Sequence, residues 1–363
     1  MSNIRTSMDP GNLPALPRPE AEPWRAVNPN KRLKIVIAAM GPALFSLALA
    51  LAFGIDPSVA VVLIFLPLQV ATAIFIGRML FGKKGTGDAL LIVFTVFFSL
   101  IVAGLLSSVL YSVISQGLHA MSWQFMSQNN TYITPTTSLD YGGVGHAVLG
   151  TVLIVGLTTL LTVPLGILVS VYLTETRSKL RTVVRTLVQA MSGLPSVVAG
   201  LFIYSALIVG FHIGYGGWLG SLALLPLMLP TVARVAEEAL RLVPQDLRNG
   251  ALALGAPAYR AFLQVTLPAA KSGLVTAVIL GVARVIGETA PLILTVNSSN
   301  GTVVDLSKPM AALPTYIFQF IANVYDSSVQ RAWGAALMVL ILVAILFTAA
   351  RLVSRDKRAT KRK

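Results

Sequence analysis

The sequence predicts an all-α membrane protein that crosses a bilayer about eight times. Of its 363 residues, 55% are hydrophobic and 12% are charged, whereas soluble domains carry roughly a quarter charged residues. Several stretches exceed about 20 residues with almost no charge, which is the length that a helix needs to cross a hydrocarbon core. Most Lys and Arg residues lie between these stretches, where they orient a membrane protein. The chain is therefore expected to be polytopic.

Eight apolar stretches are long enough to form transmembrane helices. The first two make a hairpin around a short turn at residues 54–57, and a long polar stretch follows the third. A segment with several charges at residues 244–270 separates the sixth from the seventh. The predicted helices cover residues 35–54, 58–81, 89–115, 145–173, 190–210, 217–243, 271–296 and 333–353.

The positions of Lys and Arg predict that both termini are cytoplasmic. With an even number of helices, nearly all basic residues outside the spans fall on the side that holds the termini, as the positive-inside rule requires. The opposite side holds only Lys308 and Arg331. Residues 1–34 are polar and rich in proline and have no apolar core, so we expect a disordered cytoplasmic tail rather than a signal peptide. Residues 354–363 form a basic cytoplasmic tail.

Composition and missing motifs exclude several functional classes. The net charge of +14 does not indicate a nucleic-acid binder, because the basic residues flank apolar spans instead of clustering with aromatics on a soluble domain. The absence of cysteine excludes disulfides and thiolate metal sites, and the three histidines have no metal-ligand spacing. No Gly-x4-Gly-Lys-Ser/Thr loop is present, so the chain is not expected to bind ATP in the usual way. We expect no catalytic residues, no metal and no cofactor of its own.

Charged residues inside the predicted spans are the strongest candidates for a functional site. Arg234 and Glu237 lie three residues apart on the sixth span, and Arg284 and Glu288 lie four apart on the seventh. At these spacings opposite charges share a helix face. A charge at the centre of a bilayer costs at least about 3 kcal/mol, so such groups should face a partner or a wet cavity. Prolines in both spans also free backbone carbonyls, which suit a lined cavity better than lipid.

Two interpretations of these charges remain open. They can hold the helices together as ion pairs, or they can line a pathway for an anion. Guanidinium groups offer paired donors to a tetrahedral oxyanion. A carboxylate can accept a hydrogen bond from hydrogen phosphate but would repel sulfate. As a pathway, Arg234, Glu237, Arg284 and Glu288 would therefore suit phosphate.

The segment between the sixth and seventh spans predicts a first short helix. Asp246 can cap this helix, and the small residues Gly250 and Ala251 would let another backbone come close. Gly255 stands where a left-handed residue commonly ends a helix.

A second helical turn from Ala258 carries Tyr259, Phe262 and Leu263 on one small apolar face, and Leu267-Pro268 would stop it. This surface requires a groove in a partner, or it rests on lipid headgroups.

The same segment resembles the cytoplasmic loop of bacterial ABC importer permeases. In that family an acidic-Ala-Ala start, a Gly and a terminal Leu-Pro recur at fixed spacing. Gly255 occupies the glycine position, and Val265 and Leu267-Pro268 occupy the closing positions. Asn249 stands where the family usually has Glu, and Gly250 replaces an Ala.

This resemblance implies that the loop docks into a separate ATPase subunit and carries its motion into the membrane. The residues implied in this coupling are Asn249, Gly250, Ala251, Gly255, Phe262, Leu267 and Pro268.

Three further runs resemble the PstA-type permeases of phosphate-specific ABC transporters. They lie at residues 193–202, 237–244 and 287–292, within a likeness that covers about 145–350. The resemblance implies a six-helix type I importer core at residues 89–353, preceded by an extra helical hairpin at residues 35–88. It also implies roles in transport, which map onto Arg234, Glu237 and Arg284.

The resemblance implies partners as well. These are a homologous second permease of the PstC type, two ATPase subunits of the PstB type that use ATP and magnesium, and an extracytoplasmic phosphate-binding protein of the PstS type. The expected location is a bacterial inner membrane. Alternatives are a permease of this family for another anion or small solute, and a secondary transporter that needs no ATPase. A membrane enzyme is disfavoured because the histidines are far from the buried carboxylates.

Overall fold

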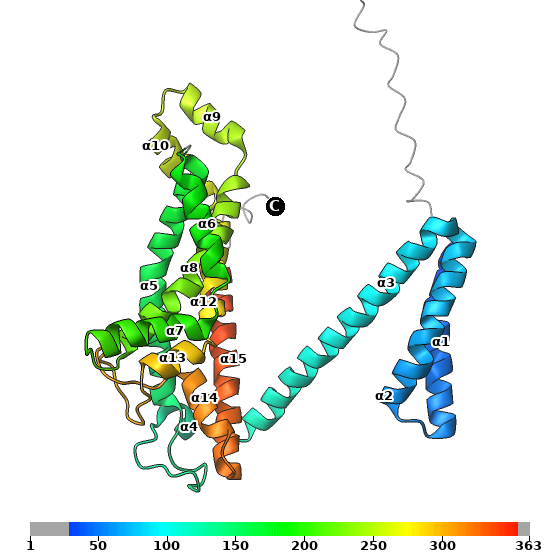
Figure 1. Cartoon of the computed structure of the whole chain (residues 1–363), viewed down its shortest axis with the longest axis horizontal. Helices are drawn as coiled ribbons and strands as arrows, with labels where there is room; N and C mark the ends of the chain where they lie inside the picture. Colours follow the sequence, from blue (N-terminus) through cyan, green and yellow to red (C-terminus); the bar gives the residue numbers. More distant parts are fainter. Residues whose placement is uncertain (1–28, 177, 355–363) are drawn as a thin grey trace, which may run out of the picture. The chain divides into compact units, whose positions relative to one another are not determined.

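The computed structural model describes residues 29–176 and 178–354, and these residues are organised as two compact units. One unit comprises the described residues up to Ser108 and the other begins at Val109. All regular elements in the described ranges are helices (Figure 1). Within the described residues, six helices are long and apolar enough to cross a membrane, or up to eight if each of two bent pairs forms one span. The predicted all-α polytopic fold is thus confirmed.

The boundaries of the predicted segments differ from those of the structure. Residues 1–28 and 355–363, which hold most of both predicted tails, lie outside the described residues. Residues 29–34, assigned to a disordered tail, are instead helical, because the first helix begins at Pro29. The two units meet inside one helix, after Ser108, whereas the sequence suggests a boundary after residue 88.

The first unit contains the predicted hairpin. Its elements are α1 (Pro29–Phe53), α2 (Pro57–Ala60), the π-helical η2 (Val61–Phe65) and the part of α3 (Leu66–Leu118) up to Ser108. At the turn Gly54 takes a φ of +64°, and Asp56 Oδ1 accepts a hydrogen bond from the Ser58 N–H at 2.8 Å. Gly82, with a φ of +69°, divides α3, and helix resumes directly after it. The predicted loop at residues 82–88 is therefore a single-residue break.

The second unit holds the end of α3 and the remaining elements. They are α4 (Trp123–Ser127), α5 (Gly145–Glu175), α6 (Leu180–Ser192), α7 (Ser196–Ile203), η3 (Tyr204–Gly210), α8 (Gly217–Arg241), α9 (Gln245–Ala253), α10 (Ala258–Ala261), η4 (Phe262–Thr266), α11 (Leu267–Ala269), α12 (Lys271–Val285), α13 (Ala290–Thr295), α14 (Leu313–Ile321) and α15 (Asp326–Ser354). Within this unit α9 and α10 lie at one end of the long helices, and α4 lies at the other (Figure 1).

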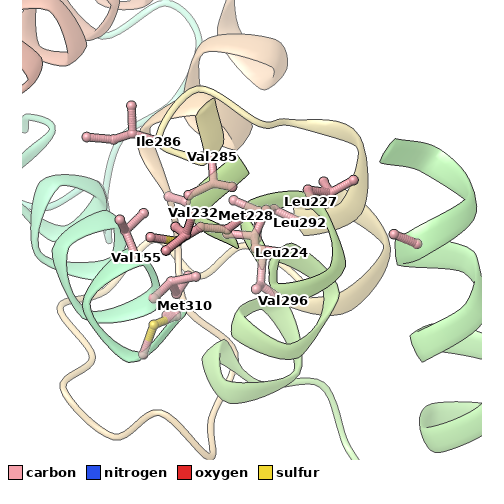
Figure 2. Close-up of a cluster of buried hydrophobic side chains, with 13 residues drawn as sticks. Val155, Leu224, Leu227, Met228, Val232, Val285, Ile286, Leu292, Val296 and Met310 are labelled. Atoms are coloured by element: carbon pink, nitrogen blue, oxygen red, sulfur yellow. The ribbon is translucent and has the colours of Figure 1, made fainter. Parts of the chain in front are cut away.

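Helix α8 is the centre of the second unit. It packs along α5 and also against α12. Its buried side chains, including Leu224, Met228 and Val232, form one cluster with Val285 of α12 (Figure 2). A Cβ atom on Gly281 of α12 would lie 2.6 Å from Cγ2 of Val232, so only glycine permits this spacing. Close approach through small residues is the usual way in which membrane helices associate.

Two predicted spans are broken in the structure. The helix predicted at residues 190–210 is interrupted at Gly193–Pro195, and the segments on either side meet at 101°. Proline fixes φ and lacks an N–H, which explains the break. The helix predicted at residues 271–296 ends at Val285 and resumes as α13, which has a proline in its first turn. The last helix begins at Asp326 rather than residue 333, with an acidic residue in its first turn, where the helix dipole favours it.

Arg331 is fully buried in α15, although the sequence places it before the last predicted span, in a segment on the side opposite the termini. Its Nη2 donates to the carbonyl oxygens of Ser138 and Tyr141, each at 2.7 Å. In the same end of the unit, Nδ2 of Asn130 donates to the hydroxyl of Tyr316 at 3.1 Å. These polar contacts hold the polar stretch before α5 against α14 and α15.

Candidate functional site

A polar pocket of about 290 Å³ lies between α6 and α8, with one residue of α5 in its wall. Charged side chains of both signs face it, together with one amide. Its lining residues are Leu173, Arg185, Val188, Gln189, Arg234, Glu237, Glu238 and Arg241. Helix α8 supplies four of the charged residues because Arg234, Glu237, Glu238 and Arg241 recur every three or four positions and share one face.

Glu237 is the most enclosed charged group in this pocket, with a side chain that is 13% exposed. Its Oε1 accepts hydrogen bonds from Nη2 of Arg185 at 2.7 Å and from Nη2 of Arg241 at 2.5 Å. The predicted partner, Arg234, makes neither contact. The helix spacing is compatible with an Arg234–Glu237 pair, but two other guanidinium groups are already on the carboxylate.

Arg234 lines the same pocket, is exposed, and forms no ion pair within the described ranges. Its guanidinium donors are therefore free to bind an anion that enters the pocket. Glu238 is exposed and likewise has no ion pair with any described residue.

Arg284 and Glu288 form the ion pair that their spacing predicts. Nη1 of Arg284 contacts Oε1 of Glu288, although α12 ends between them at Val285. The backbone still forms a turn between Arg284 and Glu288, because the Glu288 N–H donates to the Val285 carbonyl at 3.1 Å. Neither Arg284 nor Glu288 is among the described residues that line the pocket around Glu237. The four predicted residues thus occupy two places rather than one.

Sequence reasoning missed Arg185, Gln189 and Arg241. Arg185 and Gln189 lie four apart on α6, a strongly amphipathic helix whose polar face meets α8. The amphipathic pattern of α6 could have identified these two α6 residues from the sequence. The contact between Arg185 and Glu237 could not have been predicted, because it depends on the bend after α6.

The segment from α9 to α11 forms the exposed surface that the sequence predicts. Leu254 is 91% exposed and Tyr259 is 61% exposed, so apolar side chains lie uncovered on it. Gly255 ends α9 with a φ of +86°, a left-handed conformation that favours glycine. Of the other predicted coupling residues, Asn249, Gly250 and Pro268 are exposed, and Ala251, Phe262 and Leu267 are half-buried.

Two details of this segment differ from the prediction. Asp246 does not cap α9: the cap position is Pro244, and Asp246 lies in the first turn. Leu267-Pro268 does not stop the second helix, because both residues begin α11. The chain bends after Ala269, by 67°, before α12 begins.

Comparison with known proteins gives a consistent family. The sequence profile described as "Binding-protein-dependent transport system inner membrane component" matches residues 162–359. A protein of Yersinia pestis, "Phosphate transport system permease protein PstA", is 34% identical over 252 residues, which are 69% of this chain and 84% of that protein. A protein of the same name from Pasteurella multocida (strain Pm70) is 36% identical over 251 residues, with 69% and 88% coverage.

Matches to solved structures are also found. A chain of the MetNI methionine ABC transporter in an inward-facing conformation is 22% identical, with a TM-score of 0.46, and the match covers 59% of this chain and 93% of that chain.

Proposed function

Because the chain belongs to the family of binding-protein-dependent transport system inner membrane components, we propose that it is the membrane-spanning permease subunit of an ATP-driven phosphate importer. The observation that carries the cargo assignment is the 34–36% identity to two relatives named phosphate transport system permease protein PstA, of which the matches span 84–88%. Family membership supports a role as an importer subunit, and the two relatives support phosphate as the cargo.

The pocket around Glu237 has the chemistry that hydrogen phosphate requires. Arg234 offers free guanidinium donors for the phosphate oxygens. Both ion pairs of Glu237 end on Oε1, so Oε2 has no ion pair or hydrogen bond from the described residues and can accept the P–OH proton in a hydrogen bond. Sulfate has no such proton at neutral pH and would meet the carboxylate unfavourably.

Arg284 and Glu288 are proposed as a second position on the same pathway. Their ion pair lies where the helix is interrupted, and interrupted helices in transporters commonly line substrate routes. Arg284 is 49% exposed at its side chain, so an anion can reach it when Glu288 is displaced.

The exposed segment α9–α11 is proposed to dock into the ATPase. The residues proposed to form the contact are Asn249, Gly250, Ala251, Gly255, Phe262, Leu267 and Pro268. The uncovered side chains of Leu254 and Tyr259 support a docking surface, because apolar groups at this density are covered by a partner. Small residues at 250 and 251 would admit a partner backbone closely.

The orientation of the chain in the membrane and its partners follow from the proposed docking of α9–α11 into the ATPase. The α9 end faces the cytoplasm, and an even number of spans then puts both termini there, in a bacterial inner membrane. The complex would contain a PstC-type second permease, two PstB-type ATPase subunits that bind ATP and magnesium, and a PstS-type phosphate-binding protein outside. In this proposal the chain supplies no catalytic residue and holds no cofactor of its own.

Uptake measurements test the proposal directly. Right-side-out vesicles with enclosed ATP would carry this chain with a PstC-type permease and a PstB-type ATPase, with the phosphate-binding protein added outside, and ATP-dependent accumulation of labelled phosphate and sulfate would be compared. We expect phosphate uptake that Arg284→Gln abolishes while the complex still assembles and hydrolyses ATP. Uptake of neither anion by an intact, ATP-hydrolysing complex would leave the importer but reject phosphate as cargo. Uptake of sulfate in preference to phosphate would establish a different anion permease.

A further inference from the structure

Arg248 of α9 and Glu175, the last residue of α5, form a two-point ion pair. Nη1 of Arg248 donates to Oε1 of Glu175 at 2.8 Å, and Nη2 lies 2.5 Å from Oε2. The two side chains are 33% and 21% exposed. A paired contact between a guanidinium and a carboxylate fixes orientation as well as distance, which a single contact does not. The pair therefore holds α9 in one position relative to the end of α5.

Helix α9 has few other contacts with the long helices. None of its residues is buried, and it packs chiefly on η4 and α10, which belong to the same exposed segment. In the described ranges, the Arg248–Glu175 pair is the one ion pair or side-chain hydrogen bond between α9 and a membrane-spanning helix. The space around it is a polar pocket of about 450 Å³, not an apolar contact.

Helix α5 leads from this pair toward the proposed phosphate pathway. It has 31 residues, which correspond to about 46 Å at 1.5 Å per residue. It packs along α8, the helix that carries Arg234 and Glu237. A displacement of Glu175 therefore acts on a continuous helix that adjoins the pocket and reaches the opposite end of the unit.

We propose that the Arg248–Glu175 pair transmits the movement of α9 to α5 and so couples ATP hydrolysis to transport. Both are positioning residues and neither contacts the cargo. The inference rests on the proposed docking of α9 into an ATPase. It adds a specific route into the membrane, beside the covalent connection from α9 to α8 through residues 242–244.

A double-mutant cycle tests transmission through the Arg248–Glu175 pair while the covalent connection from α9 to α8 stays intact. The variants are Glu175→Gln, Arg248→Gln and the double variant, each measured in vesicles that contain the complete complex. Arg181→Gln is the matched control, because Arg181 lines the same pocket but forms no ion pair within the described part of the chain. The measured quantity is labelled phosphate imported per ATP hydrolysed.

We expect each single variant to lower this ratio by about fivefold or more, and the double variant to fall no further, because residues that act as a pair are not additive. The control should stay within about twofold of wild type. An unchanged ratio in either single variant would overturn the proposal. So would losses that multiply in the double variant, or loss of the ATPase from the complex, which would assign the pair to docking.

Failure of the proposed function would be visible in the wild type instead, as ATP hydrolysis without phosphate uptake. In that case the stimulation of ATP hydrolysis by the external binding protein replaces uptake as the measurement. The single variants should then keep basal hydrolysis and lose about fivefold in stimulation. Unchanged stimulation would reject transmission through this pair whatever the cargo is.

Discussion

Nη2 of Arg185 lies 2.7 Å from Oε1 of Glu237, and this contact joins α6 to α8 across the pocket that we assign to phosphate. The two residues are 52 positions apart in the chain. The side chain of Arg185 is 39% exposed and that of Glu237 is 13% exposed. The more accessible guanidinium of Arg185 therefore orients the enclosed carboxylate of Glu237.

Arg185→Gln should impair transport more than stability. The Arg185 side chain of this ion pair is 39% exposed, so water screens the interaction and it contributes about 1 kcal/mol or less, and the thermal midpoint of the purified chain should change little. Glu237 would lose a charged donor that orients it, and phosphate uptake should fall by about tenfold, as expected for a charge-assisted hydrogen bond. Arg181→Gln, on the same helix, is the control for a change of charge alone. Equal losses in the two variants would show that only net charge matters.

Glu237→Gln should reduce discrimination against sulfate. The amide no longer repels a fully ionised oxyanion, so the ratio of phosphate to sulfate uptake should fall by about tenfold, which corresponds to roughly 1.4 kcal/mol. Competition between the two labelled anions measures this ratio in one preparation. Glu238→Gln is the matched variant, since Glu238 lines the same pocket but is exposed. If Glu237→Gln still excludes sulfate as wild type does, the carboxylate is not the selectivity element.

Helix spacing indicated which charges in this site can pair within a helix, but it did not select the actual partner of Glu237, and contacts between helices were not accessible. The Arg284–Glu288 pair follows from a spacing of four residues on one helix, and the structure contains it. Arg241, four residues after Glu237 on α8, has the same spacing and could have been identified from it, whereas Arg185 required knowledge of how α6 lies against α8. The sequence pattern treats residues 190–210 as one span, whereas the bend at Gly193–Pro195 turns α6 toward α8 and brings Arg185 to the carboxylate.

Hydropathy located the long helices well but could not reveal which basic residues are buried. The turn at residues 54–57 and the left-handed Gly255 were predicted correctly, because local backbone conformation determines both. The sequence placed Arg331 in the segment on the side opposite the termini, just before the span predicted from residue 333, and gave no indication of its burial. Its burial depends on carbonyl groups almost 200 residues earlier in the chain.

Gly281→Val should destabilise the second unit. Its Cβ would lie 2.6 Å from Cγ2 of Val232 and would force α12 away from α8. Overpacking of this kind typically costs about 1–3 kcal/mol. Thermal unfolding of the purified chain in detergent measures the effect. Gly156→Val is the control, because a Cβ on Gly156 in α5 meets no atom within 4 Å. Similar losses for both would indicate helix propensity rather than packing.

Gly255→Ala and Gly250→Ala should have opposite effects on the α9–α11 segment, for which we propose docking into the ATPase. Gly255 adopts a φ of +86°, so a side chain there adds strain of about 1–3 kcal/mol. Gly250 lies within α9 and a Cβ on it would meet no atom within 4 Å, so alanine should stabilise the helix by about 0.5–1 kcal/mol. Co-purification with the ATPase should weaken for Gly255→Ala and persist for Gly250→Ala. Loss of binding in Gly250→Ala would instead show that the partner backbone occupies the space at that position.

Arg331→Gln should release the polar stretch before α5. The guanidinium is fully buried and donates to the carbonyls of Ser138 and Tyr141, so its removal takes away the charged donor that joins this stretch to α15. The expected loss of stability is about 2–3 kcal/mol. Amide hydrogen exchange at residues 138–141 should become faster even below the unfolding temperature. Lys308→Gln removes the other basic residue assigned to the same side, and because Lys308 is exposed, stability should change by less than about 0.5 kcal/mol. Unchanged exchange in Arg331→Gln would show that other contacts, such as Asn130–Tyr316, hold this stretch in place.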